Sequence, residues 1–305
     1  MTQVHTIARD SAPSSATSTR KALNPKTVTV FLDAGPSGNK RAAHAVALAQ
    51  RWDAHLVGVH VVFTSEALHP CDSYAIGERA IQQVIAHEKE VRADDEEVAS
   101  QVGEQFVDLC SRSDVSCEFR GISWRQPAED AILNALHSDL VIVGHPQPNG
   151  LPGDVSLETI FLASGAPLVV LPNAWHGKAI GDKVLVAWNA SREARRAVSD
   201  ALSFLVAAKA VTVLLVDPGK RHRHGEEPGA DIALQLARHG ARVNVDSVTS
   251  NGASIAQVIL SYAIESSSDL LVFGAYSHAR LRQRLLGGTT RTLLAQMPVP
   301  VLVSR

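Results

Sequence analysis

The fold is decided by a short stretch that occurs twice, as Ser-Asp-Leu-Val-Ile-Val-Gly at residues 138–144 and as Ser-Asp-Leu-Leu-Val-Phe-Gly at residues 268–274. Four of the seven positions are identical, and the two copies are 130 residues apart. Each copy holds a continuous apolar run that ends at a glycine, which is typical of a strand covered on both faces of a parallel sheet. The recurrence predicts a duplicated structural unit.

A second pair of matching stretches marks the start of each unit, because residues 28–34 parallel residues 184–190 at an offset of 156. The two offsets differ by 26, so the first unit carries about that many additional residues between its two matches. This surplus lies near residues 73–112, and we expect it to form one long helix or a helical pair. The units also end alike, at residues 166–171 and 299–304.

The chain is therefore expected to hold two tandem domains, residues 27–172 and 182–305, joined by a linker at residues 173–181. Each domain alternates strand and helix signals in the order β-α-β-α-β-α-β-α-β, which predicts an α/β, doubly wound, mostly parallel sheet with helices on both faces. Residues 1–26 are rich in Ser, Thr and Ala, and we expect a disordered tail there. Their alternative interpretation, an organelle transit peptide, is disfavoured because Arg9 and Arg20 are the only basic residues before Lys21.

Composition excludes several classes of function for this chain of 305 residues. Twenty-nine Lys and Arg against 31 Asp and Glu give a net charge of -2, so nothing favours nucleic acid or an anionic membrane as partner. No apolar run approaches the roughly 18 residues that span a bilayer. Three cysteines without a Cys-x-x-Cys pair argue against a disulfide framework, and they favour a reducing compartment, the cytoplasm.

The segment that follows residues 268–274 carries groups suited to a phosphate. It ends in Gly287 and Gly288, where a helix is expected to begin, and Thr289 and Thr290 add hydroxyl groups. Ligands of open α/β sheets bind outside the carboxyl ends of the strands, and a helix N-terminus attracts anions. The segment holds no acid but several arginines, namely Arg280, Arg282, Arg284 and Arg291.

Two interpretations of this segment remain open, a phosphate cradle and a glycine turn beside a basic, solvated helix. His278 lies inside the segment, where it is a candidate phosphate contact or an ordinary loop histidine. Neither a Gly-Lys-Ser/Thr P-loop nor a Gly-x-Gly-x-x-Gly pattern is present. The His-x-His pair at residues 222–224 is better read as part of a solvated loop than as a zinc site, so no metal site is expected.

The first unit differs at the same place. Alignment from the final strand backward sets Asp154 opposite Gly287, and the loop at residues 144–153 is three residues shorter and lacks Lys and Arg. An aspartate at a helix N-cap would occupy the N–H donors that a phosphate needs and would repel its charge. We therefore expect no nucleotide at this position of the first unit.

The residues at 274–278, 286–290 and 299–303, together with the tandem architecture, resemble the universal stress protein family in its two-domain form. The resemblance implies a Rossmann-like, five-stranded parallel sheet in each domain. It also implies pairing through the last strands, either in a homodimer or within one chain. Many members bind ATP through glycine, two residues, glycine, nine residues, glycine and then Ser or Thr, while an aspartate after the first strand contacts the base.

Carried over to this chain, the resemblance assigns the three motif glycines, the hydroxyl position and the base-contacting position to Gly274, Ser277, Gly287, Gly288 and Asn189. Three of these depart from the family pattern. Ser277 adds a side chain, Gly288 lacks the hydroxyl that Thr289 and Thr290 offer one and two places later, and Asn189 is a neutral amide. In the first unit Asp33 fits the base position, whereas Gln147 and Asp154 do not fit the motif.

These observations support three hypotheses of different classes. The leading one is a non-enzymatic stress-response protein that binds ATP or a related adenine nucleotide in its second domain. The second is an interaction or scaffold protein of the same fold that is independent of nucleotide, as the departures at Asn189, Ser277 and Gly288 suggest. The third, a slow ATPase, is the weakest, because residues 274–291 hold no carboxylate to bind a metal or position a water.

Overall fold

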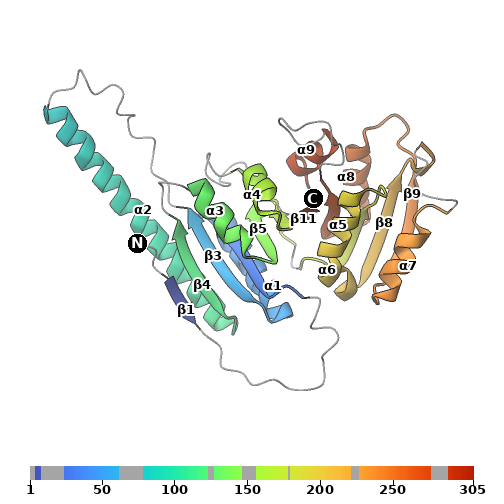
Figure 1. The fold of residues 1–305 in the computed structure, drawn as a ribbon, viewed down its shortest axis with the longest axis horizontal. Helices are drawn as coiled ribbons and strands as arrows, with labels where there is room; N and C mark the ends of the chain where they lie inside the picture. The colour runs from blue at the N-terminus through green and yellow to red at the C-terminus, as the bar shows by residue number, and fades with distance from the viewer. Residues whose placement is uncertain are drawn as a thin grey trace.

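The two copies of the duplicated stretch form central strands, β5 (Leu140–Gly144) and β10 (Leu270–Gly274), of a single eleven-stranded sheet in the computed structural model. Figure 1 shows the two halves of the chain side by side. We name them the first half (residues 27–172) and the second half (residues 182–305). The structure describes residues 4–7, 24–61, 78–122, 127–145, 156–177, 179–220, 227–275 and 288–305.

The sheet runs in the order β1-β4-β3-β2-β5-β6-β11-β10-β7-β8-β9. Five strands of each half are mutually parallel, and the last strands of the two halves, β6 and β11, meet antiparallel. Each half is thus the expected doubly wound α/β unit. The remaining bounds are β1 (Val4–Ile7), β2 (Thr27–Leu32), β3 (His55–Val61), β4 (Cys117–Ile122), β6 (Leu168–Leu171), β7 (Lys183–Ala187), β8 (Ala210–Val216), β9 (Val243–Val248) and β11 (Val301–Ser304).

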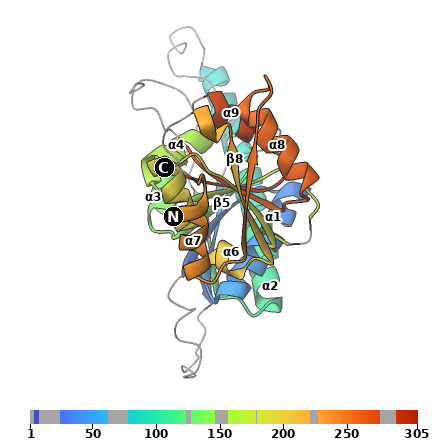
Figure 2. The same cartoon turned by 90° about the vertical axis from the view of Figure 1, so that its right-hand side faces the viewer.

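Helices cover both faces of the sheet, because its central strands are apolar on both sides (Figures 1 and 2). One apolar layer is formed with α1 (Pro36–Trp52), α2 (Glu78–Arg112), α5 (Arg192–Asp200), α6 (Leu202–Ala207) and α7 (Ala230–Arg238). The opposite layer is formed with α3 (Pro127–Leu136), α4 (Leu157–Ser164), α8 (Ile255–Glu265) and α9 (Gly288–Ala295). A short 3₁₀ turn, η3 (Pro218–Lys220), follows β8. Both layers draw residues from both halves, so the halves share their core.

The surplus residues of the first half form one helix of 35 residues, α2, and the N-terminal part of this helix extends past the sheet in Figure 1. The helix is anchored by Phe106, which is 2% exposed and lies on β3 and β4. A Cβ added at Gly58 of β3 would come within 2.6 Å of the Phe106 ring, so the strand needs a glycine there. Helix α2 therefore packs directly onto the sheet.

The aspartate of each duplicated stretch explains why that stretch recurs. Asp139 accepts hydrogen bonds from the N–H groups of Lys26 and Thr27 at 2.7 and 3.0 Å. In the second half, Asp269 accepts from the N–H groups of Gly181, Asp182 and Lys183 at 2.9 to 3.2 Å. Each aspartate thus secures the start of the first strand of its half, where backbone N–H groups would otherwise lack partners.

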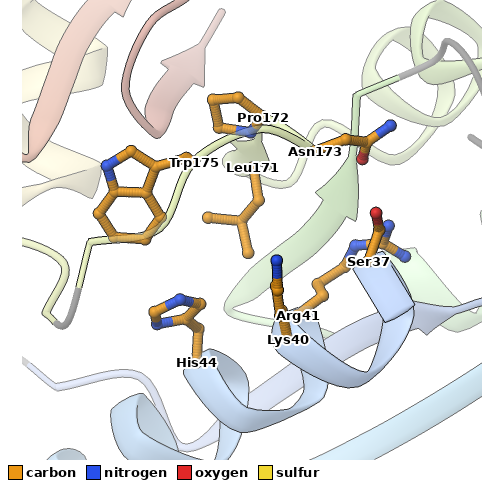
Figure 3. A pocket seen from close by; sticks show the side chains of 8 residues that line it. All are labelled: Ser37, Lys40, Arg41, His44, Leu171, Pro172, Asn173 and Trp175. Carbon is orange, nitrogen blue, oxygen red and sulfur yellow. The ribbon is translucent and has the colours of Figure 1, made fainter. Parts of the chain in front are cut away.

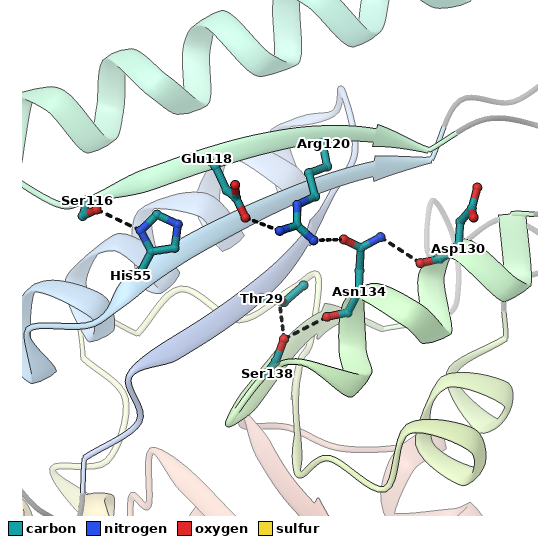
Figure 4. A network of polar contacts seen from close by, with 8 residues as sticks. All are labelled: Thr29, His55, Ser116, Glu118, Arg120, Asp130, Asn134 and Ser138. Carbon is teal, nitrogen blue, oxygen red and sulfur yellow. Dashed lines mark hydrogen bonds and ion pairs between the residues drawn. The ribbon is translucent and has the colours of Figure 1, made fainter. Parts of the chain in front are cut away.

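A polar network in the first half joins two strands of the sheet to α3 (Figure 4). Ser138 shares a 2.6 Å hydrogen bond with Thr29 and donates to the Asn134 carbonyl at 3.0 Å. Arg120 of β4 donates to Asn134 Oδ1 at 2.7 Å and forms an ion pair with Glu118. Side chains of β4, β2 and α3 are therefore tied together where α3 crosses the sheet.

The two halves pair within one chain through their last strands, as the family resemblance implied. Val301, Leu302 and Val303 of β11 face Val170, Val169 and Leu168 of β6. His145 Nε2 also lies 3.1 Å from the Leu294 carbonyl of α9, so the residue after β5 contacts the other half. The antiparallel pairing makes the chain an intramolecular pseudo-dimer.

The prediction of a disordered tail is wrong for residues 4–7. They form β1, which pairs antiparallel with β4, with Val4 opposite Arg120 and Ile7 opposite Cys117. An edge strand presents unpaired backbone N–H and C=O groups, and another strand can pair with them whatever its sequence. Composition alone therefore does not reveal such pairing. The rest of the tail up to residue 23 lies outside the described residues. Within the described part of the chain, no helix combines the length and apolar character needed to cross a membrane.

Candidate functional site

The candidate site of the second half lies at the point where the strand order reverses. Strands β7 and β10 are parallel neighbours in the sheet, although three strands precede β10 in this half. Asn189 follows β7, and Gly274 ends β10. Both therefore stand at the carboxyl edge, where open α/β sheets bind ligands.

Asn189 is half-buried and already uses its side-chain oxygen. Oδ1 accepts a hydrogen bond from the Ser191 N–H at 3.1 Å, and Ser191 in turn caps α5 by accepting from the Ala194 N–H at 3.1 Å. A backbone N–H requires an acceptor, so this bond fixes which end of the amide is oxygen. The group that Asn189 can offer to a ligand is therefore the Nδ2 donor.

Gly274 has a structural role that needs no ligand. A Cβ at this position would lie 2.1 Å from the Glu193 carbonyl carbon and 2.3 Å from the Ala194 nitrogen. The first turn of α5 thus passes directly over the end of β10, and only glycine leaves room for its backbone.

Helix α9 begins at Gly288, as the sequence predicted, and β11 follows it in the chain. Gly288 and Thr289 are exposed, whereas Thr290 is turned inward and 7% exposed. A Cβ at Gly288 would meet nothing within 4 Å, and the first turn of α9 contains no acid. The exposed start of α9 therefore suits an anion, and Thr289 is the better placed hydroxyl. Ser277, His278, Gly287, Arg280, Arg282 and Arg284 lie outside the described residues.

The corresponding position of the first half is occupied by an internal ion pair. Asp33 accepts from the Gly35 N–H at 3.0 Å, and its other oxygen accepts from Arg41 Nη2 at 3.0 Å. Arg41 also donates to the Phe31 carbonyl at 2.6 Å. The two side chains are 5% and 22% exposed, for Arg41 and Asp33 respectively. Burial lowers the pKa of Arg41, and the carboxylate of Asp33 acts against that shift.

Arg41 also covers the glycine that ends β5. A Cβ added at Gly144 would lie 2.0 Å from Arg41 Nη2. The offset of 156 sets Ala197 opposite Arg41, so the second half has no guanidinium there. The sequence contains this difference, and an alignment of α1 with α5 would have found it. The prediction that the first half binds no nucleotide rested on Gln147 and Asp154, which lie outside the described residues. Arg41 gives a separate physical reason to expect no nucleotide there.

Two hollows flank α1 in the first half. One is the small pocket drawn in Figure 3, between α1 and the chain that leaves β6. The other measures about 260 Å³ and lies between α1 and α2, with Asp33 at its rim. Among the described residues, no three His, Cys, Asp or Glu side chains gather as a metal site would require.

The sheet order and the switch-point residues define an α/β domain of the Rossmann-like class. Residues 181–305 match the model of the universal stress protein family. The second half is therefore a domain of the universal stress protein family. No curated protein matches the chain in sequence.

Solved structures extend the likeness of fold to the first half. A universal stress protein from Archaeoglobus fulgidus is 17% identical with a TM-score of 0.64, and the match covers 92% of this chain and 98% of that one. A candidate universal stress protein from Pseudomonas aeruginosa is 17% identical with a TM-score of 0.52, covering 93% and 94%. Both likenesses support the tandem arrangement of two such folds.

Proposed function

We propose that the second half binds ATP or a related adenine nucleotide, and that the protein acts in a stress response without catalysing a reaction. One observation carries the proposal. Gly274 and the residue after β7 lie at the carboxyl ends of two neighbouring parallel strands, and the same family domain contains the exposed start of α9, which follows β10 in the chain. The base of an adenine nucleotide would contact the residue after β7, and its phosphate chain would contact the start of α9.

The described residues suggest a division of roles. Asn189 Nδ2 would donate to an acceptor of the base, because its oxygen is held by Ser191. The N–H groups at the start of α9 and the Thr289 hydroxyl would receive a phosphate. Gly287, Ser277 and His278 extend this cradle by sequence.

The first half serves in this proposal as a structural partner. Its Asp33 carboxylate would have to release Arg41 before it could contact a base, and Arg41 would have to leave Gly144. Moving a buried, paired guanidinium leaves an uncompensated carboxylate, which is costly. A single nucleotide per chain is therefore expected.

The absence of acids from residues 274–291 underlies the non-enzymatic part of the proposal. Phosphoryl transfer generally needs a carboxylate to hold the metal and a group to position the attacking water. Occupancy would instead bias contacts with partners or with a second copy of the chain, in the cytoplasm.

The test is a titration of the full chain with ATP and ADP, followed by thermal unfolding and calorimetry. We expect binding with one site per chain, and loss of binding in Gly287→Asp, which copies Asp154 of the first half. Failure of wild type to bind at millimolar nucleotide would favour the interaction-protein alternative. Unchanged binding by Gly287→Asp would show that the cradle is misplaced.

A further inference from the structure

Two thiols meet at the end of α2, in a part of the first half that the proposed nucleotide site does not include. Cys110 stands in the last turn of α2, and Cys117 begins β4. Both residues carry free thiols and both are 0% exposed. The Cys110 thiol donates a hydrogen bond to the sulfur of Cys117, so the two side chains are already in contact in the folded chain.

The packing of α2 on β4 sets this contact. The helix and the strand run in opposite directions, and the rings of Phe106 and Phe119 lie side by side with their centres 6.4 Å apart. Cys110 is four residues further along α2, and Cys117 is two residues back along β4. Four helical residues rise by about 6 Å and two strand residues by about 6.6 Å. The two steps match, so the thiols face each other in the same interface as the rings.

The second half builds the same turn without thiols. The residue five places after Cys110 donates its N–H to the Cys110 carbonyl at 3.0 Å, and the same bond to the Leu236 carbonyl of α7 measures 3.1 Å. An offset of 126 therefore sets Leu236 opposite Cys110 and Val243 of β9 opposite Cys117. Apolar side chains satisfy the fold at both positions, so packing alone does not explain a pair of thiols in the first half.

The hydrogen bond between the thiols makes the two sulfurs unequal. It lowers the pKa of Cys117, against the opposing effects of burial and of the Glu118 carboxylate. The same bond, together with burial, raises the pKa of Cys110. The thiolate is the nucleophilic form of cysteine. Cys117 is therefore suited to attack an oxidant, and Cys110 is suited to resolve the product.

The turn that follows α2 is the part of the chain whose opening would expose the pair. Ser111, Arg112 and Asp114 are all exposed, and helix ends open locally at less cost than a core strand. Asp114 has a φ of 52°, whereas Gly240 takes its place in the second half at a φ of 88°. A residue with a Cβ adopts this left-handed region at some cost, which opening of the turn would relieve.

We propose that Cys110 and Cys117 form a redox-sensitive pair, which a hydroperoxide converts into an intrachain disulfide. The Cys117 thiolate attacks the peroxide, so that a sulfur–oxygen bond forms, the oxygen–oxygen bond breaks and the leaving alkoxide takes up a proton. The Cys110 sulfur then attacks the resulting sulfenic acid, the sulfur–sulfur bond forms, and the hydroxyl group leaves as water with the Cys110 proton. Two thiols and one hydroperoxide thus give one disulfide, one alcohol and one water.

The disulfide would fasten the end of α2 to the start of β4. A disulfide needs its sulfurs about 2.0 Å apart, and these two side chains already touch across a closed turn. The bond would join two elements that the chain already holds together, and a dithiol reductant would open it again. Oxidation would therefore be reversible without rearrangement of the sheet.

The experiment uses the full chain carrying Cys71→Ser, which leaves Cys110 and Cys117 as its only thiols. The native protein is treated with hydrogen peroxide, the remaining thiols are alkylated, and tryptic peptides are analysed by mass spectrometry without reduction. Trypsin cleaves at Arg112, between the two cysteines, so the two flanking peptides stay joined only through a disulfide. We expect loss of both thiols, one joined peptide, and its separation by dithiothreitol.

A native chain that keeps both thiols free overturns the proposal, and the urea-unfolded chain, treated in the same way, shows whether burial is the cause. Disulfides between separate chains, seen on a non-reducing gel, would also overturn it. So would oxidation of one sulfur to a sulfinic acid without a joined peptide, because the second thiol would then fail to resolve the first product.

Matched variants in the same background test the roles of the two sulfurs. Cys110→Ser keeps a hydroxyl donor beside Cys117 but removes the resolving sulfur, so dimedone should capture a sulfenic acid at Cys117. Cys117→Val copies Val243 and leaves Cys110 alone, where we expect about tenfold less capture. Capture that is equal in the two variants, or greater in Cys117→Val, overturns the assignment of the attacking sulfur. Circular dichroism confirms that both variants keep the fold.

The thiol pair and the proposed nucleotide site lie in different halves of the chain. ATP binding by the Cys71→Ser chain is measured separately, before and after peroxide. Failure to bind ATP would leave the disulfide result standing, and failure to form the disulfide would leave the nucleotide proposal standing.

Discussion

The two halves share a sheet order but differ at the residue that follows their first strand. In the first half, Asp33 is held by Arg41, and the guanidinium lies over Gly144. In the second half, Ala197 stands at the position of Arg41, so no guanidinium reaches Asn189 from that position. The arginine on the first helix thus engages the carboxylate that stands at the candidate ligand position.

The largest expected effect is on stability, from removing Arg41. Arg41→Ala leaves the Asp33 carboxylate and the Phe31 carbonyl without their partner, so unfolding in urea should show a loss of about 3 kcal/mol. Asp33 is partly exposed, which keeps the loss at the low end for a broken buried pair. Arg196→Ala removes an exposed ion pair and should cost less than about 1 kcal/mol. Equal losses of unfolding free energy in the two variants would show that the Asp33–Arg41 pair contributes no more than an exposed ion pair.

Glycine substitutions sharpen the comparison at the ends of β5 and β10. Gly274→Ala would press a methyl group onto the backbone of α5 and should destabilise the chain by about 2 kcal/mol. Gly144→Ala meets the end of the Arg41 side chain, so its cost should fall sharply once Arg41 is also replaced by alanine. Gly288→Ala points into open space and serves as the control, with an unfolding midpoint close to wild type.

Asn189→Asp tests which group of the second half meets the base. The change replaces the Nδ2 donor by a second carboxylate oxygen, so ATP binding should weaken by about tenfold, or about 1.4 kcal/mol. Calorimetry measures the effect, with Asn189→Ala as the control for loss of the donor alone. Tighter binding by Asn189→Asp would mean that the base donates to this residue, as the aspartate of the family pattern suggests.

A smaller effect concerns pH, because the halves differ at the end of their second strand. His60 of β3 is 8% exposed, and burial lowers its pKa from 6.5, against the opposing effects of the Leu32 carbonyl, Asp33 and Asp95. The unfolded chain then binds more protons below pH 6.5, so stability should fall as pH drops from about 6.5 toward the folded pKa. In β8 the corresponding residue is Leu215, which does not titrate.

His60→Asn should flatten this part of the pH profile, since an amide can donate to the Leu32 carbonyl as Nδ1 does without titrating. Chemical unfolding at several pH values between 5 and 7.5 measures it. An unchanged slope would assign the pH dependence to other groups, among them the half-buried His44, whose pKa burial also lowers.

Most of the fold was readable from the sequence because its signals are local. The apolar runs at 140–144 and 270–274 predicted central strands, and the 26-residue surplus predicted one long helix or a helical pair, of which the structure has the single helix α2. The addition of β1 to the edge of the sheet was not predicted, since edge pairing uses backbone groups that any sequence has. The shared sheet followed only from the family resemblance, because strand pairing between halves leaves no periodicity to read.

The candidate site was less readable, because its chemistry depends on which side chains meet. Asn189, Gly274 and Gly288 were predicted as site residues by motif position, but the role of Gly274 in admitting α5 appears only in three dimensions. Asp33 fitted the family pattern by sequence, yet its carboxylate is held by Arg41 eight residues later. A motif match reports the type of residue, and its hydrogen-bond partners decide whether that residue is available.

The most direct test of the account is the stoichiometry of ATP binding to the full chain, measured by isothermal titration calorimetry on wild type and Gly287→Asp. We predict one site per chain in wild type and no binding at that site in the variant. Two sites per chain would show that the Asp33–Arg41 pair opens to admit a second nucleotide. One site that survives Gly287→Asp would place the nucleotide away from the switch point of the second half, and the account would be wrong.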